Sequence, residues 1–203
     1  MIAIIDYGMG NIHSVEKALQ SFGEKTLIAN TPEALRKCEK IVLPGVGAFD
    51  DAMLELKKQG LVAGIKEEIK KRKVFLGICL GMQLLFEQSQ EAKEEKGLGI
   101  LAGDVKKFSE KSGEKIPHMG WNQLRIKNQA CPLLKGIPDN SSVYFCHSYY
   151  PDPQEAQAIA TTTDYGINFT SIVWKENIYG VQFHPEKSQE AGLKILKNFI
   201  ELC

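Results

Sequence analysis

Cys79 lies in the stretch of the chain that best combines reactive chemistry with strong local structure, residues 74–86. A short apolar segment meets the turn Gly77-Ile78-Cys79-Leu80-Gly81 and then continues as an apolar, helix-like stretch. The pattern is typical of a nucleophile elbow, in which two glycines remove side chains that would collide across a strained turn. We expect the sulfur to point out of the sheet edge into solvent, with a helix N-terminus favouring its thiolate. The alternative is an ordinary buried core cysteine.

A cysteine nucleophile needs a base and a group that orients the base, and His184 and Glu186 have the right chemistry. The apolar run 178–183 predicts a strand that leads directly into His184, and open α/β sheets bind ligands at the carboxyl ends of their strands. Pro185 favours an extended backbone at His184, and residues two apart in an extended segment point to the same side. We therefore expect the Glu186 carboxylate to reach the His184 ring. The alternative is a solvated turn.

Acyl transfer also needs preorganised donors for the developing oxyanion. The turn at 44–47, Pro-Gly-Val-Gly, leaves another predicted strand and can supply one N–H, and Leu80 can supply a second. Gln83 lies one helical turn after Cys79, so we expect it to face the same side and to help hold the substrate.

The elements that must position these groups alternate along the first half of the chain. Apolar runs at 2–5, 26–29, 41–43 and from 74 predict strands. Amphipathic stretches through 12–22, from 31, and through 53–56 and 65–69 predict helices. The second half predicts antiparallel or mixed strands around 143–149, 172–174 and 178–183, and a closing helix over 193–200. We expect an α/β fold with a central, mostly parallel sheet flanked by helices, and additional antiparallel strands in the C-terminal half.

Bulk properties limit the possible functions. The 203 residues suit a single domain over 1–203, and 25 basic residues cancel 25 acidic ones. We therefore expect no nucleic-acid partner and no anionic membrane partner. The apolar stretch at 74–86 is too short to span a bilayer, and Met1 leads directly into an apolar run without a signal-peptide pattern. These features predict a cytoplasmic protein.

The cysteines also favour a reducing compartment. There are five of them, widely scattered, with no Cys-x-x-Cys and no Cys/His spacing suited to zinc. The Gly8-x-Gly10 pair lacks the third glycine of a dinucleotide-binding loop, where His13 stands instead. We expect no disulfide, no metal and no cofactor.

Five motifs, in order along nearly the whole chain, resemble those of class I (triad-type) glutamine amidotransferases. Among these, they are most similar to the glutaminase subunits of imidazole glycerol phosphate synthases. The motifs are PGVGAF at 44–49, GICLGMQLLF at 77–86, PHMGWN at 117–122, HSY at 147–149 and HPEKS at 184–188. The resemblance implies a flavodoxin-like fold with the cysteine elbow.

The resemblance also implies that Cys79 attacks the side-chain amide of glutamine and forms a γ-glutamyl thioester. His184 would protonate the departing ammonia and later activate water, held by Glu186. The oxyanion turn at Val46 and Gly47 would have to reorient, so the isolated subunit would be nearly idle. The residues implied to bind substrate are Gln83, Glu91, His147, Ser148 and Tyr149.

The implied partner is a (β/α)8-barrel cyclase, which would form a heterodimer with this chain and use the channelled ammonia to make imidazole glycerol phosphate in histidine biosynthesis. The residues implied at the docking face are Gly10, Asn11, Pro117, His118, Met119, Gly120, Trp121, Asn122 and Lys187. The chain departs from the family pattern at Ser148, where threonine is usual, and at Tyr150, where arginine is common.

Several interpretations stay open. From the residues alone, Trp121 is either a core anchor or an exposed docking aromatic. His118 can be purely structural, and His147 is as well explained by a satisfied, partly buried histidine as by a binding one. A rival function is a glutaminase subunit that serves another synthase, such as one for nucleotide-sugar or glycan amidination. Another is a catalytically silent regulatory subunit, against which the intact Cys79, His184 and Glu186 argue.

Overall fold

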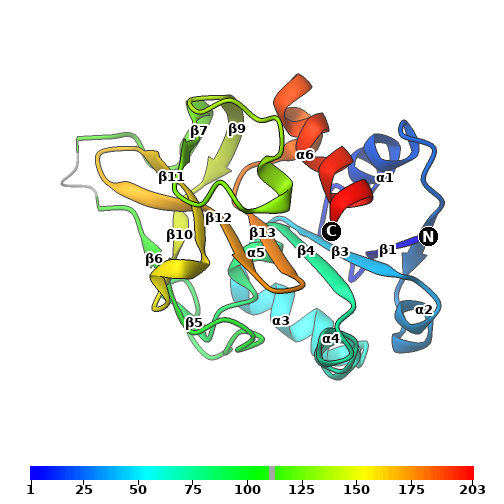
Figure 1. Cartoon of the computed structure of the whole chain (residues 1–203). Helices are drawn as coiled ribbons and strands as arrows, with labels where there is room; N and C mark the ends of the chain where they lie inside the picture. The colour runs from blue at the N-terminus through cyan, green and yellow to red at the C-terminus, as the bar shows by residue number, and fades with distance from the viewer. Residues whose placement is uncertain (110–112) are drawn as a thin grey trace.

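The centre of the molecule is an eight-stranded sheet in the order β2-β1-β3-β4-β13-β12-β11-β8 (Figure 1). The computed structural model describes residues 1–109 and 113–203. The strands of this sheet are β1 (Ile2–Ile5), β2 (Thr26–Ala29), β3 (Lys40–Gly45), β4 (Val74–Cys79), β8 (Arg125–Ile126), β11 (Ile159–Asp164), β12 (Asn168–Lys175) and β13 (Ile178–Val181). The first four and β13 are parallel, and β12, β11 and β8 add antiparallel pairings. The predicted fold class is confirmed.

The apolar runs of the parallel strands are buried because both faces of the sheet are covered. Successive residues of a strand point to opposite faces. In β1, Ile2 and Ile4 join one hydrophobic cluster, whereas Ala3 and Ile5 join the other. Two packed faces explain why this strand is a continuous apolar run and not an alternating one.

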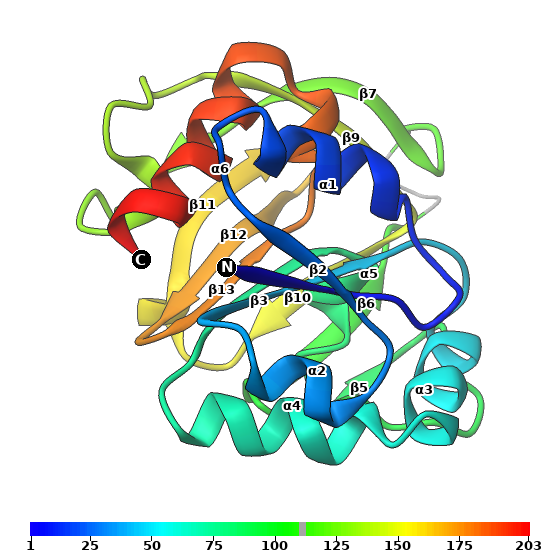
Figure 2. The same ribbon diagram turned by 90° about the vertical axis from the view of Figure 1, so that its right-hand side faces the viewer.

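Helices form a layer on each side of the sheet, as Figure 2 shows. α1 (Ile12–Gln20) and α6 (Gln189–Leu202) cover one face. α2 (Pro32–Arg36), α3 (Phe49–Lys58) and α4 (Leu61–Lys70) cover the other. The described residues, 1–109 and 113–203, contain no helix that is both long and apolar enough to cross a membrane.

Two smaller sheets accompany the antiparallel half. β10 (Tyr149–Pro153), β6 (Gly103–Lys107) and β5 (Gln88–Ser89) form one of them. β7 (His118–Gln123) and β9 (Ser142–His147) form the other. Only Ser148 separates β9 from β10, so the chain at 147–149 passes from one small sheet to the other. Short 3-10 helices are η2 (Pro132–Leu134), η3 (Ala156–Ala158) and η4 (Pro185–Lys187).

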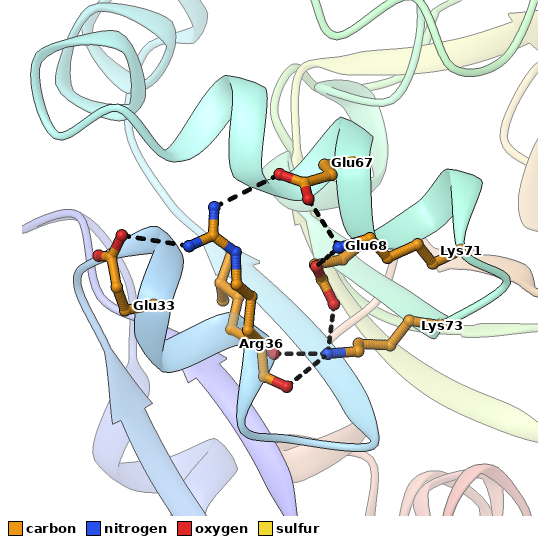
Figure 3. Close-up of polar contacts among 7 residues, drawn as sticks. Glu33, Arg36, Glu67, Glu68, Lys71 and Lys73 are labelled. Carbon is orange, nitrogen blue, oxygen red and sulfur yellow. Dashed lines mark hydrogen bonds and ion pairs between the residues drawn. The ribbon is translucent and has the colours of Figure 1, made fainter.

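Ion pairs hold the amino end of β4, opposite to the elbow (Figure 3). The carboxylate of Glu68 in α4 is buried and contacts Nζ of Lys71 at 3.0 Å and Nζ of Lys73 at 2.5 Å. Lys73 Nζ also donates to the carbonyl oxygens of Leu35 at 2.7 Å and Arg36 at 3.3 Å. The start of β4 is therefore tied to both α2 and α4.

The helix after the elbow is shorter than its apolar pattern predicted. α5 (Leu80–Gln83) has four residues, whereas the helix-like pattern continues to Phe86. The Leu84 carbonyl accepts from Leu98 N at 2.8 Å, and the Phe86 carbonyl accepts from Gly99 N at 3.1 Å. These carbonyls bond a distant segment, so the helix ends.

Candidate active site

The elbow turn has the geometry that its two glycines predict. Cys79 ends β4 with φ +54° and ψ −111°, a strained backbone conformation for a residue with a side chain. A Cβ atom on Gly77 would lie 2.5 Å from the Gly81 carbonyl oxygen, and one on Gly81 would lie 1.8 Å from the Leu43 carbonyl oxygen. Both distances are far inside van der Waals contact, so this turn requires glycine at both positions.

The Cys79 side chain lies in a cavity and not, as expected, out in solvent. Cys79 is 6% exposed and lines a cavity of about 320 Å³ at the carboxyl ends of β3, β4 and β13. Gly45 of β3 pairs with Cys79, and Val181 of β13 pairs with Ile78, so the segments that follow these two strands flank the cysteine. Because α5 has four residues, its macrodipole is small and stabilises a thiolate less than the sequence suggested.

His184 and Glu186 contact each other, although the backbone between them differs from the expected one. His184 Nδ1 lies 3.0 Å from Glu186 Oε1. His184 itself is extended, as expected, with φ −96° and ψ 97°. Residues 185–187 form η4, so the contact spans a 3-10 turn and not an extended segment. Burial opposes a charge on His184, but hydrogen bonds with Cys79 and Glu186 outweigh it and raise the pKa of His184 to about 10. At neutral pH the ring therefore carries a proton that it can donate.

Ser188 holds this turn through two hydrogen bonds of its side chain. Its buried Oγ donates to the His184 carbonyl at 2.6 Å and accepts from Tyr144 N at 2.9 Å. His184 N in turn donates to the Tyr144 carbonyl at 3.0 Å. The histidine is therefore tied to β9 as well as to β13.

The turn at 44–47, expected to supply an oxyanion donor, lies on the β3 side of the same cavity. Val46, Gly47 and Leu80 all line it, together with Cys79. Gly47 has φ +92°, and a Cβ atom there would lie 2.7 Å from Met9 Cε. The candidate donors and His184 thus stand on opposite sides of Cys79.

The other expected substrate residues also line the cavity. Gln83, Glu91, Ser148 and Tyr149 are among them. Gln83 Nε2 donates to the Tyr149 carbonyl at 2.9 Å. Glu91 Oε2 accepts a hydrogen bond from Phe49 N at 3.0 Å. That bond lowers the pKa of Glu91, but burial outweighs it and the pKa is raised. The cavity is therefore lined by a carboxylate, an amide and hydroxyl groups as well as by the cysteine.

His147 lines the cavity, but both of its ring nitrogens already have partners. Nδ1 donates to the Tyr149 carbonyl at 2.8 Å, and Nε2 lies 3.2 Å from Nδ1 of His118. Burial lowers the pKa of His147 to about 3 and that of His118 to about 4, so both rings are neutral. The structure favours the interpretation of the His147 ring as a satisfied, buried histidine, and substrate binding by the segment 147–149 stays a prediction.

The expected docking face is exposed around β7, with one exception. Met119 and Trp121 are 62% and 49% exposed, so Trp121 is not a core anchor. The Trp121 ring lies edge-on to Tyr144, with centroids 6.0 Å apart. His118 is only 3% exposed and stacks on Tyr165, so its side chain points away from the docking face and corrects that expectation. The other expected residues of this face are partly or fully exposed: Gly10, Asn11, Pro117, Gly120, Asn122 and Lys187.

Sequence reasoning missed Gln182 and Tyr144. Gln182 is 0% exposed, and its Nε2 lies 3.7 Å from Cys79 Sγ. The sequence did carry a signal, because Gln182 is a polar residue inside the apolar run 178–183 and lies two positions before His184. Tyr144 lines the cavity from β9, where no motif marks it.

Comparisons with known proteins agree with this geometry. The family model described as glutamine amidotransferase class-I matches residues 3–202. A protein of Methanocaldococcus jannaschii named imidazole glycerol phosphate synthase subunit HisH is 50% identical over 206 residues, covering 100% of both chains. A protein of the same name from Caldanaerobacter subterraneus subsp. tengcongensis is 51% identical, covering 100% of this chain and 98% of the relative.

Solved structures show the same fold at low sequence identity. A crystal structure titled glutamine amidotransferase superposes with a TM-score of 0.78 at 15% identity, covering 100% of this chain and 98% of the other. PurLQS from Thermotoga maritima gives a TM-score of 0.78 at 19% identity, covering 98% and 96%. The chain belongs to the glutamine amidotransferase class-I family.

Proposed function

We propose that this chain is the glutaminase subunit of an imidazole glycerol phosphate synthase, which hydrolyses L-glutamine to L-glutamate and ammonia for histidine biosynthesis. Relatives that carry this subunit name match it at 48% to 51% identity over nearly their whole length, which supports the assignment. The observation that carries the chemistry is that Cys79 and His184 line one cavity while Glu186 contacts the His184 ring.

Cys79 is the proposed nucleophile, with His184 as its acid and base. The sulfur attacks the amide carbon of glutamine, and a C–S bond forms as the carbonyl oxygen takes negative charge. The C–N bond then breaks as protonated His184 gives its proton to the nitrogen, which leaves as ammonia. Neutral His184 next removes a proton from water, whose oxygen attacks the γ-glutamyl thioester and releases glutamate and the thiolate. Glu186 holds the His184 ring throughout.

The negative oxygen of both tetrahedral intermediates needs donors opposite His184. Val46, Gly47 and Leu80 line the cavity on that side, so their main-chain N–H groups are the proposed oxyanion donors. The turn at 44–47 would have to reorient for this role. The ligand-bound partner would drive that change and so activate the subunit.

Gln83, Glu91, Ser148 and Tyr149 are the proposed contacts for the amino and carboxylate groups of the substrate. The Gln83 amide nitrogen already donates to two acceptors, so its Oε1 is the polar atom that it offers to the substrate amino group. Glu91 suits the same ammonium group, since a half-buried carboxylate gains an opposite charge when that group binds. Ser148 and Tyr149 complete this end of the cavity.

The proposed partner is a (β/α)8-barrel cyclase that forms a heterodimer with this chain and receives the ammonia. Met119 and Trp121 supply an exposed apolar surface beside the cavity, with Lys187 and Asn11 nearby in the proposed face. The chain would act in the cytoplasm as a single amidotransferase domain over 1–203, without metal or cofactor.

Affinity labelling tests this proposal. The chain is incubated with the histidine-pathway cyclase, a cyclase ligand and a chloroketone analogue of glutamine, and the adduct is located by peptide mass spectrometry. We expect one adduct on Cys79, formed faster in the ligand-bound complex than in the isolated chain. A label elsewhere, or a Cys79→Ala variant that hydrolyses glutamine at the wild-type rate, would contradict the mechanism.

Complementation separates the two possible ammonia acceptors. We expect the gene to restore growth of a bacterial strain that lacks its own glutaminase subunit for histidine synthesis. Growth failure together with intact glutaminase activity would favour a different synthase as the partner.

A further inference from the structure

Gln182 is a buried polar side chain beside the nucleophile. It follows β13 directly, is fully inaccessible to solvent, and places Nε2 3.7 Å from Cys79 Sγ. Burying an amide without hydrogen bonds destabilises the fold, so we expect both polar atoms of Gln182 to have partners. Its Oε1 lies 3.1 Å from Nε2 of Gln83.

The Tyr149 carbonyl decides which way both amides point. A carbonyl oxygen only accepts, so the atom of Gln83 that lies 2.9 Å from Tyr149 O must be the NH₂ group. That same NH₂ group then faces Gln182, which must present its oxygen to Gln83 and its NH₂ group to the sulfur. The reverse orientation of Gln182 would place two NH₂ groups against each other and an oxygen against Cys79.

The carbonyl that sets this direction is itself firmly placed. Tyr149 begins β10 and pairs with Lys107 of β6 in the antiparallel ladder. Its oxygen also accepts a second hydrogen bond, from Nδ1 of His147 at 2.8 Å. The main chain at Tyr149 thus sets the donor-to-acceptor direction of the hydrogen bonds that run through Gln83 and Gln182 to Cys79.

A donor aimed at sulfur favours the thiolate over the thiol, because the charged acceptor forms the stronger bond. Two titratable groups interact with the sulfur: His184, which hydrogen-bonds it, and Tyr7. The sulfur also lies 4.0 Å from the Cys146 carbonyl, which suits the thiol proton and not the thiolate. With a four-residue helix behind it, Cys79 has little help from a helix macrodipole.

We propose that Gln182 is a positioning residue of the glutaminase reaction, which donates a hydrogen bond to the Cys79 thiolate in an orientation fixed by the Tyr149 carbonyl through Gln83. The proposal rests on the proposed function for its role in turnover. The same donor stabilises the departing thiolate when the thioester is hydrolysed, so both half-reactions use it.

The pH dependence of Cys79 alkylation tests the proposal. The full chain is treated with iodoacetamide between pH 5 and 10, and the modified Cys79 peptide is quantified by mass spectrometry, separately from the exposed Cys146. In Gln182→Glu, a carboxylate replaces the donor, and we expect the alkylation midpoint to move up by about one pH unit or more. In Gln182→Met, which has a similar size but no donor, we expect a smaller upward shift. Gln157→Glu, an exposed glutamine in η3, should leave the midpoint unchanged.

Turnover in the cyclase complex gives a second readout. We expect kcat to fall about tenfold in Gln182→Met because the nucleophile loses a donor. We expect KM to change little because the Tyr149 carbonyl still holds the Gln83 amide. If Gln182→Glu does not fold, as judged by circular dichroism, Gln182→Met carries the test alone. An unchanged alkylation midpoint in a folded Gln182→Met variant would overturn the proposal. The alkylation assay needs neither glutamine nor the cyclase. If the wild-type complex hydrolyses no glutamine but the midpoint still shifts in the variants, the proposed function is refuted and the hydrogen bond to Cys79 is not.

Discussion

His118 Nδ1 lies 3.2 Å from Nε2 of His147, and the two histidines face each other directly across the β7–β9 pair. The direction of this bond is fixed at both ends. His147 Nδ1 must donate to the Tyr149 carbonyl, so its Nε2 accepts from His118. His118 Nε2 then accepts from the Asn122 side-chain amide at 3.3 Å. The pair therefore holds both rings in single neutral tautomers under the docking strand.

Acid should destabilise the fold through this pair. Burial lowers the pKa of His118 to about 4 and that of His147 to about 3, from an ordinary value of 6.5. Below pH 6.5 the two histidines bind protons in the unfolded chain but not in the folded chain. Their contribution to the unfolding free energy is therefore complete above pH 6.5 and is lost as the pH falls toward 4. Each histidine contributes up to about 1.4 kcal/mol per pH unit to the slope. Urea unfolding at successive pH values measures it.

Matched variants isolate the histidine contribution from that of carboxylates. His118→Phe keeps a ring between Phe145 and Tyr165 but removes a titrating group, so we expect lower stability at pH 7 and a shallower slope between pH 6 and 4. His13→Gln changes an exposed histidine in α1 and should leave the slope as it is. Equal slopes in wild type and His118→Phe would contradict the assignment.

Gly81 should tolerate no side chain. A Cβ atom there would lie 1.8 Å from the Leu43 carbonyl oxygen, which is backbone of the neighbouring strand and has no room to move. We expect Gly81→Ala to unfold the chain or to lower its unfolding free energy by more than about 3 kcal/mol. Gly60→Ala is the control, since Gly60 also has positive φ at +70° but nothing within 4 Å of a Cβ atom. Strain alone should cost that variant about 1 kcal/mol, and equal losses in urea unfolding would refute the steric explanation.

The sequence predicted the parts of the site that depend on local pattern. The Gly77 and Gly81 spacing determines the elbow, and apolar runs at 2–5 and 74–79 determine the central strands. These features follow from sterics and burial within a few residues. The elbow and the central strand that ends at Cys79 can therefore be predicted from the sequence alone.

The parts that the sequence did not predict depend on remote pairings. α5 ends early because carbonyls at its end bond residues 98 and 99, and Cys79 is buried because the segments after β3 and β13 flank it. The His147 ring is already hydrogen-bonded because the register of β7 on β9 brings His118 against it, 29 residues away. β8 and η2 lie between these two strands, so no short turn sets the register of β7 on β9.

Glu68 and Lys73 should stabilise the fold without affecting the chemistry. The pair lies at the amino end of β4 (Figure 3), whereas Cys79 ends that strand. Glu68→Leu leaves Lys73 without its carboxylate, so we expect it to cost about 3 kcal/mol in urea unfolding. Lys73→Met leaves Glu68 paired with Lys71, so we expect a smaller loss. The double variant should recover part of the loss in Glu68→Leu. The alkylation midpoint of Cys79 should stay constant in all three, and a shift would show coupling along β4.

Trp121 should dominate binding of the proposed cyclase partner. It is a large, exposed aromatic in β7, supported edge-on by Tyr144, and such residues carry much of the binding energy at interfaces. We expect Trp121→Ala to weaken heterodimer formation by about 30-fold or more, corresponding to about 2 kcal/mol, measured by isothermal titration calorimetry. Thermal stability and Cys79 alkylation should not change.

Leu54→Ala provides the control for that measurement. Leu54 is about as exposed as Trp121 but lies in α3 and outside the cavity. Its truncation removes a similar kind of surface without touching the proposed docking face, so we expect wild-type affinity. Equal affinities for both variants would place the partner elsewhere on the chain, whereas a selective loss in Trp121→Ala would locate it beside the mouth of the cavity that holds Cys79.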